Sequence, residues 1–437
     1  MPKRASFVAF VCALAFLCFT AGAWLATFKL FPHSIITRIH LGGKAAAALL
    51  LRRDDGRYTK TWNKQRSPRR GLVRHLPDSV SEGYTLYTSS HDQLAFLLAM
   101  DGRVVHRWHI PYGDYWKPSA DIPRRPDERY VYWRKARLMP NGDLVVIVVE
   151  AGTTPWGLGL IRIDRDSRIV WKYLKRAHHD FCIDEQGRVY VLTQRIRTRP
   201  LGDLTNIQAP FVEDLLTVLS PAGEELWSVS VYEALKKSHW TVMYRAPADE
   251  RGDYLHTNAV ALVSPAQARV CPVVRAGHLL ISMRDLDLIG TLDPESRSFS
   301  WVAKGAWIRQ HDPDILDNGN ILMFDNLGRF NRPGGRSRVM EVDPVTNETV
   351  WCFEGSDQDE FCSEVRGSQQ RLPNGNTLIT ESDGGRILEV TRGKTVVWEY
   401  VNPARNNSDS TLVAAVCGAE RIAAEWFDKG FPRSAVQ

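Results

Sequence analysis

Short runs of alternating apolar and polar residues recur along most of the chain, each after a turn that contains glycine. The clearest runs are LDNGNILMFDN from Leu316 and RLPNGNTLITES from Arg371, where an Asn-Gly turn precedes a strand-like alternation. Looser copies begin at Arg137, Asp184 and Ala276. An Asn-Gly turn followed by period-two alternation is typical of a β-hairpin. The pattern therefore predicts repeated antiparallel strands.

A second element alternates with these runs and consists of a turn, then β-branched residues, then tryptophan. It occurs six times, at intervals of 47 to 74 residues, and ends in Trp108, Trp171, Trp227, Trp301, Trp351 and Trp398. The helical period is missing between the copies, which argues against βαβ units and helical solenoids. Periodic aromatic motifs pack between neighbouring sheets in propellers. We therefore predict an all-β fold, a six-bladed β-propeller over residues 83–403.

The N-terminal segment has a different pattern, because it carries no charged residue from Ala5 to Phe28 and is rich in Phe, Leu, Val and Ala. Such a run is long enough to cross about 30 Å of hydrocarbon. Basic residues flank it on both sides, so they decide its orientation only weakly. We predict that residues 1–31 form a single transmembrane helix with the propeller on the periplasmic or extracytoplasmic side. A cleaved signal peptide is the alternative, since Ala21-Gly22-Ala23 offers small residues after the apolar core.

The formal net charge of +6 is modest, and much of the excess lies between Arg52 and Arg74. Neither a helical recognition pattern nor interleaved aromatic residues accompany this basic stretch. We interpret residues 32–82 as a solvated or membrane-proximal linker arm and expect no nucleic-acid partner. Residues 404–437 are interpreted as a C-terminal tail.

The cysteines and glycines limit the possible cofactors. The sequence contains no CxxC spacing of the kind that binds metals. It also contains no GxxxxGK[ST] loop and no GxGxxG opening a helix, which argues against a bound nucleotide donor or dinucleotide. We expect no cofactor. Cys352 and Cys362 bracket a short polar loop, and an oxidising compartment would let them form a disulfide. Two free thiols are the alternative.

Several histidines stand where a predicted blade begins: His178 and His179 in AHHDFCID, His256 in DYLHTNAV and His311 in IRQHDPDI. Equivalent positions of different blades converge on the central channel of a propeller. A lone histidine is usually structural, but three at similar positions indicate a site. The HHD sequence alone is weak evidence for a metal, which needs further ligands at suitable spacing. We predict no metal site.

The segments that hold these histidines resemble a known family. LLISMRDLDLIGTLD, RQHDPDILDNGNILMFDN and RLPNGNTLITESDGGRILEVT, with DYLHTNAV and AHHDFCID upstream, are similar to arylsulfate sulfotransferases and their arylsulfotransferase-like relatives. The resemblance covers residues 137–403. It implies that an aryl sulfate gives its sulfuryl group to a central histidine, which passes it to a phenolic acceptor.

Carried over residue by residue, the resemblance gives the nucleophile's role to His311. His256 and one of His178 or His179 would hold sulfate oxygens, and Arg284 in ISMRD would clamp them. A neutral imidazole is a competent nucleophile near pH 7, and arginine supplies charge-assisted hydrogen bonds to an oxyanion. The alternative for Arg284 is an outward-facing strand residue in a salt bridge.

Two other functions compete with sulfuryl transfer. Tryptophan-bearing repeats also occur in quinone-dependent dehydrogenase propellers, which use more blades and a bound calcium ion, but the sequence has no evident cluster of acidic ligands. A non-catalytic propeller on a membrane tether, used for binding or scaffolding, is the other alternative. An assay with an aryl sulfate separates these classes.

Overall fold

The computed structural model describes residues 2–27, 61–199, 209–238, 240, 252–328 and 335–432. The chain divides into two compact units, Met1–Tyr58 and Thr59–Gln437. Helix α1 (Pro2–Thr27) belongs to the first unit. Among the described residues, no helix combines the length and the apolar character needed to cross a membrane. The predicted transmembrane anchor is therefore not supported.

Among the described residues, the larger unit contains six antiparallel sheets of four or five strands, which we call blades and number in chain order, and one two-stranded sheet. Blade 1 contains β27 (Val416–Ile422), β3 (Tyr84–Ser89), β4 (Leu94–Leu98) and β5 (Val104–His109). Blade 2 contains β6 (Val131–Leu138), β7 (Leu144–Glu150), β8 (Gly157–Ile163) and β9 (Ile169–Tyr173). Blade 3 contains β10 (Ala177–Ile183), β11 (Val189–Arg197), β12 (Phe211–Leu219) and β13 (Glu225–Ser230).

The remaining blades follow the same order. Blade 4 contains β14 (Thr257–Leu262), β15 (Leu279–Met283), β16 (Leu288–Asp293) and β17 (Ser298–Ala303). Blade 5 contains β18 (His311–Ile315), β19 (Ile321–Asp325), β20 (Arg338–Val342) and β21 (Thr349–Glu354). Blade 6 contains β22 (Ser368–Arg371), β23 (Thr377–Glu381), β24 (Arg386–Val390), β25 (Val396–Val401) and, outermost, β2 (Gly71–His75). Short helices α3 (Tyr112–Tyr115), α4 (Val231–Lys237) and α5 (Pro265–Val270) lie in connections between strands.

The first strand of each blade, β27, β6, β10, β14, β18 or β22, is its innermost strand. Each of these strands contacts the innermost strand of the next blade, and the cycle closes from β22 to β27 and from β27 to β6. The prediction of a six-bladed propeller is confirmed. The larger ring expected of a quinone-dependent dehydrogenase is not formed.

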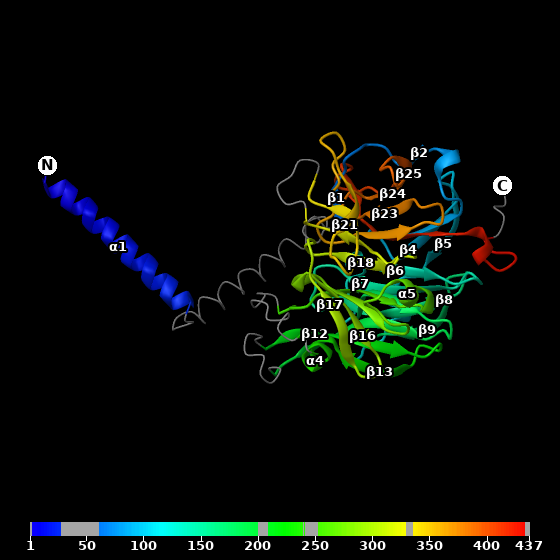
Figure 1. Cartoon of the computed structure of the whole chain (residues 1–437), viewed down its shortest axis with the longest axis horizontal. Coiled ribbons are helices and arrows are strands. Elements are labelled where there is room, and N and C mark those ends of the chain that lie inside the picture. The colour runs from blue at the N-terminus through cyan, green and yellow to red at the C-terminus, as the bar shows by residue number, and fades with distance from the viewer. Residues whose placement is uncertain are drawn as a thin grey trace. The chain divides into compact units, whose positions relative to one another are not determined.

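The ring extends beyond the predicted limits of residues 83–403. Strand β27 comes from the predicted C-terminal tail and pairs with β3, so the two ends of the described ring share one blade (Figure 1). Part of the predicted linker arm is also folded, because β2 pairs with β25 and β1 (Trp62–Lys64) pairs with β26 (Leu412–Ala414). Residues 32–60 of that arm lie outside the described residues. Of these strands, the ring needs β27, because blade 1 would otherwise lack its innermost strand.

Local sequence explains the hairpins. The Asn-Gly turns join the first and second strands of blades 2, 5 and 6, and their glycines Gly142, Gly319 and Gly375 have φ angles of 88°, 86° and 85°. Glycine adopts this left-handed conformation without the steric cost of a Cβ. Second strands such as β7 are buried along almost their whole length, because both faces of a blade pack against neighbouring blades.

The six repeat tryptophans lie at corresponding positions, on the fourth strand of each of the six blades. Three of their indole N–H groups donate to a turn of the next blade: Trp108 Nε1 to Gly142 O at 3.2 Å, Trp351 Nε1 to Arg392 O at 2.9 Å and Trp398 Nε1 to Met100 O at 3.0 Å. These side chains therefore join consecutive blades. The bond from Trp398 crosses from blade 6 to blade 1 and supports the closure of the ring.

We expect Trp398→Ala to lower the free energy of unfolding by about 3–5 kcal/mol, because Trp398 is fully buried and the change leaves a cavity. The control is Trp426→Ala. Because the Trp426 side chain is about half exposed, at 52%, its removal should lower the free energy of unfolding by less than about 1 kcal/mol. Urea unfolding followed by circular dichroism measures both. Equal losses in the two variants would contradict the proposed role of Trp398.

Candidate active site

The innermost strands are irregular where the predicted site residues lie. Five of the six carry a shift in register to their partner strand, namely β27, β6, β10, β14 and β18. A β-bulge re-aims side chains and is common beside active sites. His179 and Asp312 lie within two of these bulges and have φ angles of 52° and 51°, which are uncommon for residues other than glycine. The backbone is therefore shaped to present these side chains.

His311 opens strand β18 and is 2% exposed. Its Nδ1 lies 2.7 Å from Asn326 Oδ1 and 3.2 Å from Arg309 O. The Asn326 amide is oriented by its own Nδ2, which donates to Ser363 O at 2.6 Å and to Arg366 O at 2.8 Å. Both neighbours of Nδ1 are therefore acceptors, so Nδ1 carries the proton. The lone pair of the neutral ring lies on Nε2, which is buried and has no hydrogen-bond partner among the described residues.

The surroundings of His311 keep its ring neutral. Burial lowers the pKa of His311 well below its usual value, and the positive charges of Arg284 and Arg134 lower it further. The hydrogen bond to Asn326 acts in the opposite direction but is the smaller effect. The imidazole therefore stays uncharged near neutral pH, with Nε2 unprotonated.

The other predicted histidines form a contiguous group on blades 3 and 4. His178 Nδ1 lies 2.7 Å from His179 Nδ1, and the rings of His179 and His256 are 4.9 Å apart. Burial lowers the pKa of His178 to about 3, and that of His179 well below its usual value. Asp253 Oδ2 lies 2.7 Å from His256 Nδ1 and orients that ring. Trp156 packs against all three imidazoles, with centroid distances of 5.1 to 6.0 Å.

Arg284 lies directly after strand β15 and is buried. The alternative interpretation, in which Arg284 is an outward-facing strand residue in a salt bridge, is therefore wrong about the orientation, although a salt bridge is present. Arg284 Nη1 lies 2.6 Å from Asp285 Oδ1. The guanidinium is close enough to lower the pKa of His311, but part of its charge is balanced by its own neighbour.

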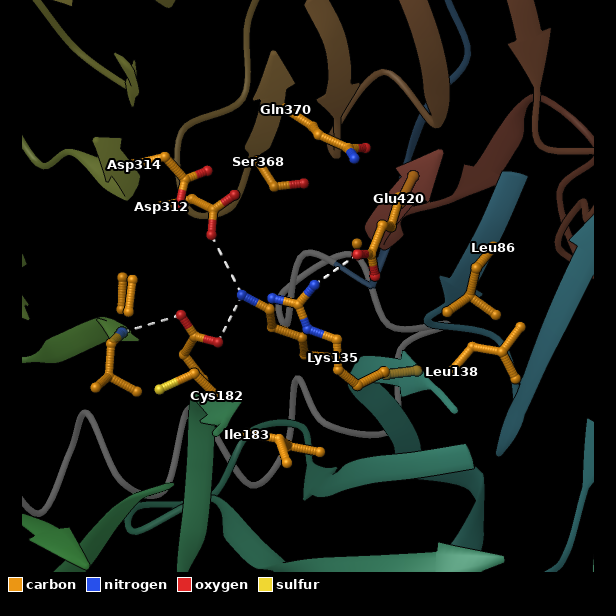
Figure 2. Close-up of a pocket in the computed structure, with 18 of the residues that line it drawn as sticks. Leu86, Lys135, Leu138, Cys182, Ile183, Asp312, Asp314, Ser368, Gln370 and Glu420 are labelled. Carbon is orange, nitrogen blue, oxygen red and sulfur yellow. Dashed lines mark hydrogen bonds and ion pairs between the residues drawn. The ribbon is translucent and has the colours of Figure 1, made fainter. Parts of the chain in front are cut away.

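A cavity of about 870 Å³ runs along the inner walls of the blades. Among the predicted site residues, His179 and His311 line it. Figure 2 shows Lys135 in the middle, with the polar residues Asp312, Asp314 and Ser368 on one side and the apolar Leu86 and Leu138 on the other. The cavity thus combines polar and apolar walls, as small-molecule sites do.

An ionic cluster crosses the cavity next to His311. Lys135 Nζ lies 2.5 Å from Asp180 Oδ1 and 3.2 Å from Asp312 Oδ1 (Figure 2). The same two carboxylates accept backbone N–H bonds from Val260 at 3.0 Å and from Gln369 at 3.2 Å. Burial acts to lower the pKa of Lys135, but the two carboxylates outweigh it and raise the pKa. Lys135 therefore stays protonated and joins three innermost strands, while the backbone bonds add two more.

Sequence reasoning missed several of these residues. Asn326 lies in the quoted segment NGNILMFDN, and Lys135, Asp180 and Asp312 adjoin quoted histidines or repeats, but their partners belong to distant parts of the chain. Cys352 and Cys362 are free thiols in this structure. In the described part of the chain, no group of three or more His, Cys, Asp or Glu side chains is placed to hold a metal ion.

Asp314 generates a pH prediction. Burial, followed by repulsion from Asp312, raises the pKa of Asp314 to about 7, whereas an unfolded aspartate titrates near about 3.9. Between these values the folded state holds the proton more tightly, so rising pH lowers the stability that Asp314 contributes. Relative to Asp314→Asn, the wild type should lose stability from about pH 4 to pH 7, at no more than about 1.4 kcal/mol per pH unit.

Urea unfolding over this pH range measures the effect. Asp317→Asn, in the exposed turn that follows, is the control for the same substitution outside the cavity. Parallel stability profiles of the wild type and Asp314→Asn would contradict the prediction.

Comparison with known proteins identifies the family. Residues 135–403, more than half of the chain, match the family model described as arylsulfotransferase (ASST). A search of curated proteins gave no match. Solved structures that are similar include a protein of unknown function from Bacteroides caccae, with 13% identity, a TM-score of 0.47, and coverage of 73% of this chain and 94% of that chain.

A streptogramin B lyase is also similar, with 12% identity, a TM-score of 0.40, and coverage of 79% of this chain and 87% of that chain. These structural likenesses are too distant to support an argument about activity. The family match instead covers blades 3 to 5 in full, together with strands β22 to β25 of blade 6, and includes every predicted site residue. The chain belongs to the arylsulfotransferase (ASST) family.

Proposed function

We propose that this protein transfers a sulfuryl group from an aryl sulfate ester to a phenolic acceptor through a sulfohistidine at His311. The observation that carries the proposal is the hydrogen bonding of His311. Asn326 and Arg309 offer only acceptors to Nδ1, so the lone pair lies on Nε2 of a neutral, buried imidazole. A fixed tautomer with an unpartnered nitrogen is what a nucleophilic histidine needs.

The proposed reaction consists of two displacements at sulfur. In the first, His311 Nε2 forms the N–S bond as the ester S–O bond breaks, and the phenolate leaves with the electron pair and takes a proton. In the second, the acceptor phenol loses its proton, its oxygen attacks sulfur, and the N–S bond breaks. The two steps return His311 to the neutral form. Splitting the transfer in this way lowers each barrier.

We assign supporting roles to the other predicted residues. Asp253 orients His256, and His256 contacts His179, so these imidazoles are suited to hold the sulfuryl oxygens or to move the phenol proton. Arg284 supplies positive charge beside His311. Trp156, packed on the three imidazoles, offers an aromatic surface for the aryl group.

A chromogenic aryl sulfate should release its phenol in a stoichiometric burst before any acceptor is added, because His311 can be sulfurylated alone. His311→Ala should abolish the burst. The histidine control is His109→Ala on the outer strand β5, which should leave the burst unchanged. Stopped-flow absorbance measures the burst, and mass spectrometry should find one acid-labile sulfuryl group on the peptide with His311. An equal burst in His311→Ala, or no burst in the wild type, would favour the non-catalytic propeller.

The low pKa of His311 also predicts a pH profile. For an imidazole of ordinary pKa, near about 6.5, the neutral fraction at pH 5.5 is about tenfold lower than at high pH. The burst rate constant of the wild type should instead stay level from about pH 8 to pH 5.5, since His311 remains neutral. Asn326→Asp places a carboxylate beside Nδ1, so it should raise the pKa of His311 and make the rate fall in this range.

The measurement is the burst rate constant at each pH, with folding of Asn326→Asp checked by circular dichroism because aspartate cannot donate to Ser363 O and Arg366 O. A wild-type rate that falls tenfold between pH 7 and pH 5.5 would contradict the assignment of a neutral, pKa-lowered His311.

A further inference from the structure

The basic side chains of the cavity wall differ in how their charge is balanced. Four arginine or lysine residues line the cavity in the described part of the chain. Three of them are ion-paired: Lys135 with Asp180 and Asp312, Arg137 with Glu420 at 2.5 Å, and Arg421 with Glu389 at 3.1 Å. Arg134 is the exception within the described ranges, where no carboxylate oxygen lies within ion-pair distance of it.

The backbone presents Arg134 to the cavity. Trp133 pairs with Val148 and Lys135 with Ile147, so Arg134 is the extra residue of the β6 bulge. Its Nη1 donates to Cys417 O at 2.6 Å, and Cys417 is the extra residue of the β27 bulge. This bond fixes the guanidinium between two innermost strands. A guanidinium has five N–H donors in a planar fork. Toward the residues that the structure describes, most of those of Arg134 remain for another acceptor.

The charge of Arg134 acts on the proposed catalytic group. Its positive charge lowers the pKa of both His179 and His311, which line the same cavity. Burial and the neighbouring charge of Arg366 lower the pKa of Arg134 itself. Arg134 is partly buried, and a cation that has lost part of its hydration without gaining a counterion among the described residues is costly. A bound anion at this place would remove that cost.

We propose that Arg134 binds the terminal oxygens of a tetrahedral sulfuryl group, as inorganic sulfate or as a sulfate monoester, beside Nε2 of His311. The proposal rests on the proposed function for the identity of the anion. Two independent observations meet here: a cavity-lining guanidinium without a carboxylate partner among the described residues, and a buried, unpartnered Nε2 on a residue of the same cavity. Planar guanidinium groups bind tetrahedral oxyanions through paired hydrogen bonds.

The proposal assigns Arg134 a larger part in binding than Arg284. Arg284 Nη1 already bonds the Asp285 carboxylate at 2.6 Å, so an incoming anion meets a partly neutralised group. Arg134 meets it with an unbalanced charge. Arg134 is therefore a substrate-binding residue, and Arg284 mainly adds to the field around His311.

Calorimetric titration with sodium sulfate at constant ionic strength tests the assignment. Arg134→Gln should weaken sulfate binding about tenfold or more, because the anion loses a charged hydrogen-bonding partner. Arg134→Lys should weaken it less, because lysine keeps the positive charge but not the planar fork of donors. Arg137→Gln removes the same charge from the same strand and is the matched control, expected within about threefold of the wild type. Sulfate binding that survives in Arg134→Gln but is lost in Arg284→Gln would overturn the proposal.

A crystal of the wild-type protein soaked in selenate gives a test that does not depend on the stability of any variant. The anomalous selenium peak should lie within hydrogen-bond reach of the Arg134 guanidinium and next to His311. A peak at Arg284 and away from Arg134, or no peak in the cavity, would overturn the assignment.

The outcomes separate the two proposals. If sulfate and selenate bind at Arg134 but an aryl sulfate releases no phenol, the oxyanion site stands and the transferase function fails. If the phenol burst occurs but binding is unaffected in Arg134→Gln, the function stands and the assignment of Arg134 fails.

Discussion

The ammonium group of Lys135, shared between Asp180 and Asp312, is the interaction on which the centre of the ring depends. It joins β6 to β10 and β18, and the backbone N–H groups of Val260 and Gln369 join the same carboxylates to β14 and β22. Desolvation makes such a partly buried cluster a weak source of stability, but removing one partner leaves costly unpaired charges. We therefore interpret the cluster as fixing the register of five innermost strands relative to one another.

This register places the catalytic machinery that we propose. Asp312 directly follows His311, so the bond that anchors Asp312 to Lys135 also holds the start of β18. Asn326, at the end of the neighbouring strand, then fixes the tautomer of His311, and its own orientation comes from two carbonyls near blade 6. Burial, and then the positive charges of Arg284 and Arg134, keep the imidazole of His311 neutral by lowering its pKa. We assign the guanidinium of Arg134 to the binding of an anion.

Much of the fold could be predicted from the sequence because its signals are local. The Asn-Gly turns, and the tryptophan on the fourth strand of each blade, are sequence patterns contained within single blades. The closure by β27 was missed because VCGAERI carries neither signal and its partner β3 lies more than 300 residues earlier. The ionic cluster and Arg134 were missed for the same reason, since their meaning comes from contacts between blades. The predicted N-terminal membrane anchor, inferred from an uncharged run, was not supported by the structure.

The proposed function depends on His311 being a neutral imidazole with its proton on Nδ1 and its lone pair on Nε2. Long-range ¹H–¹⁵N correlation spectroscopy of the protein labelled at histidine, with His311 assigned by comparison with His311→Gln, observes this directly. At pH 7 we expect a pyrrole-type resonance for Nδ1 and a pyridine-type resonance for Nε2. An imidazolium pattern, or a proton on Nε2 with the lone pair on Nδ1, would contradict it.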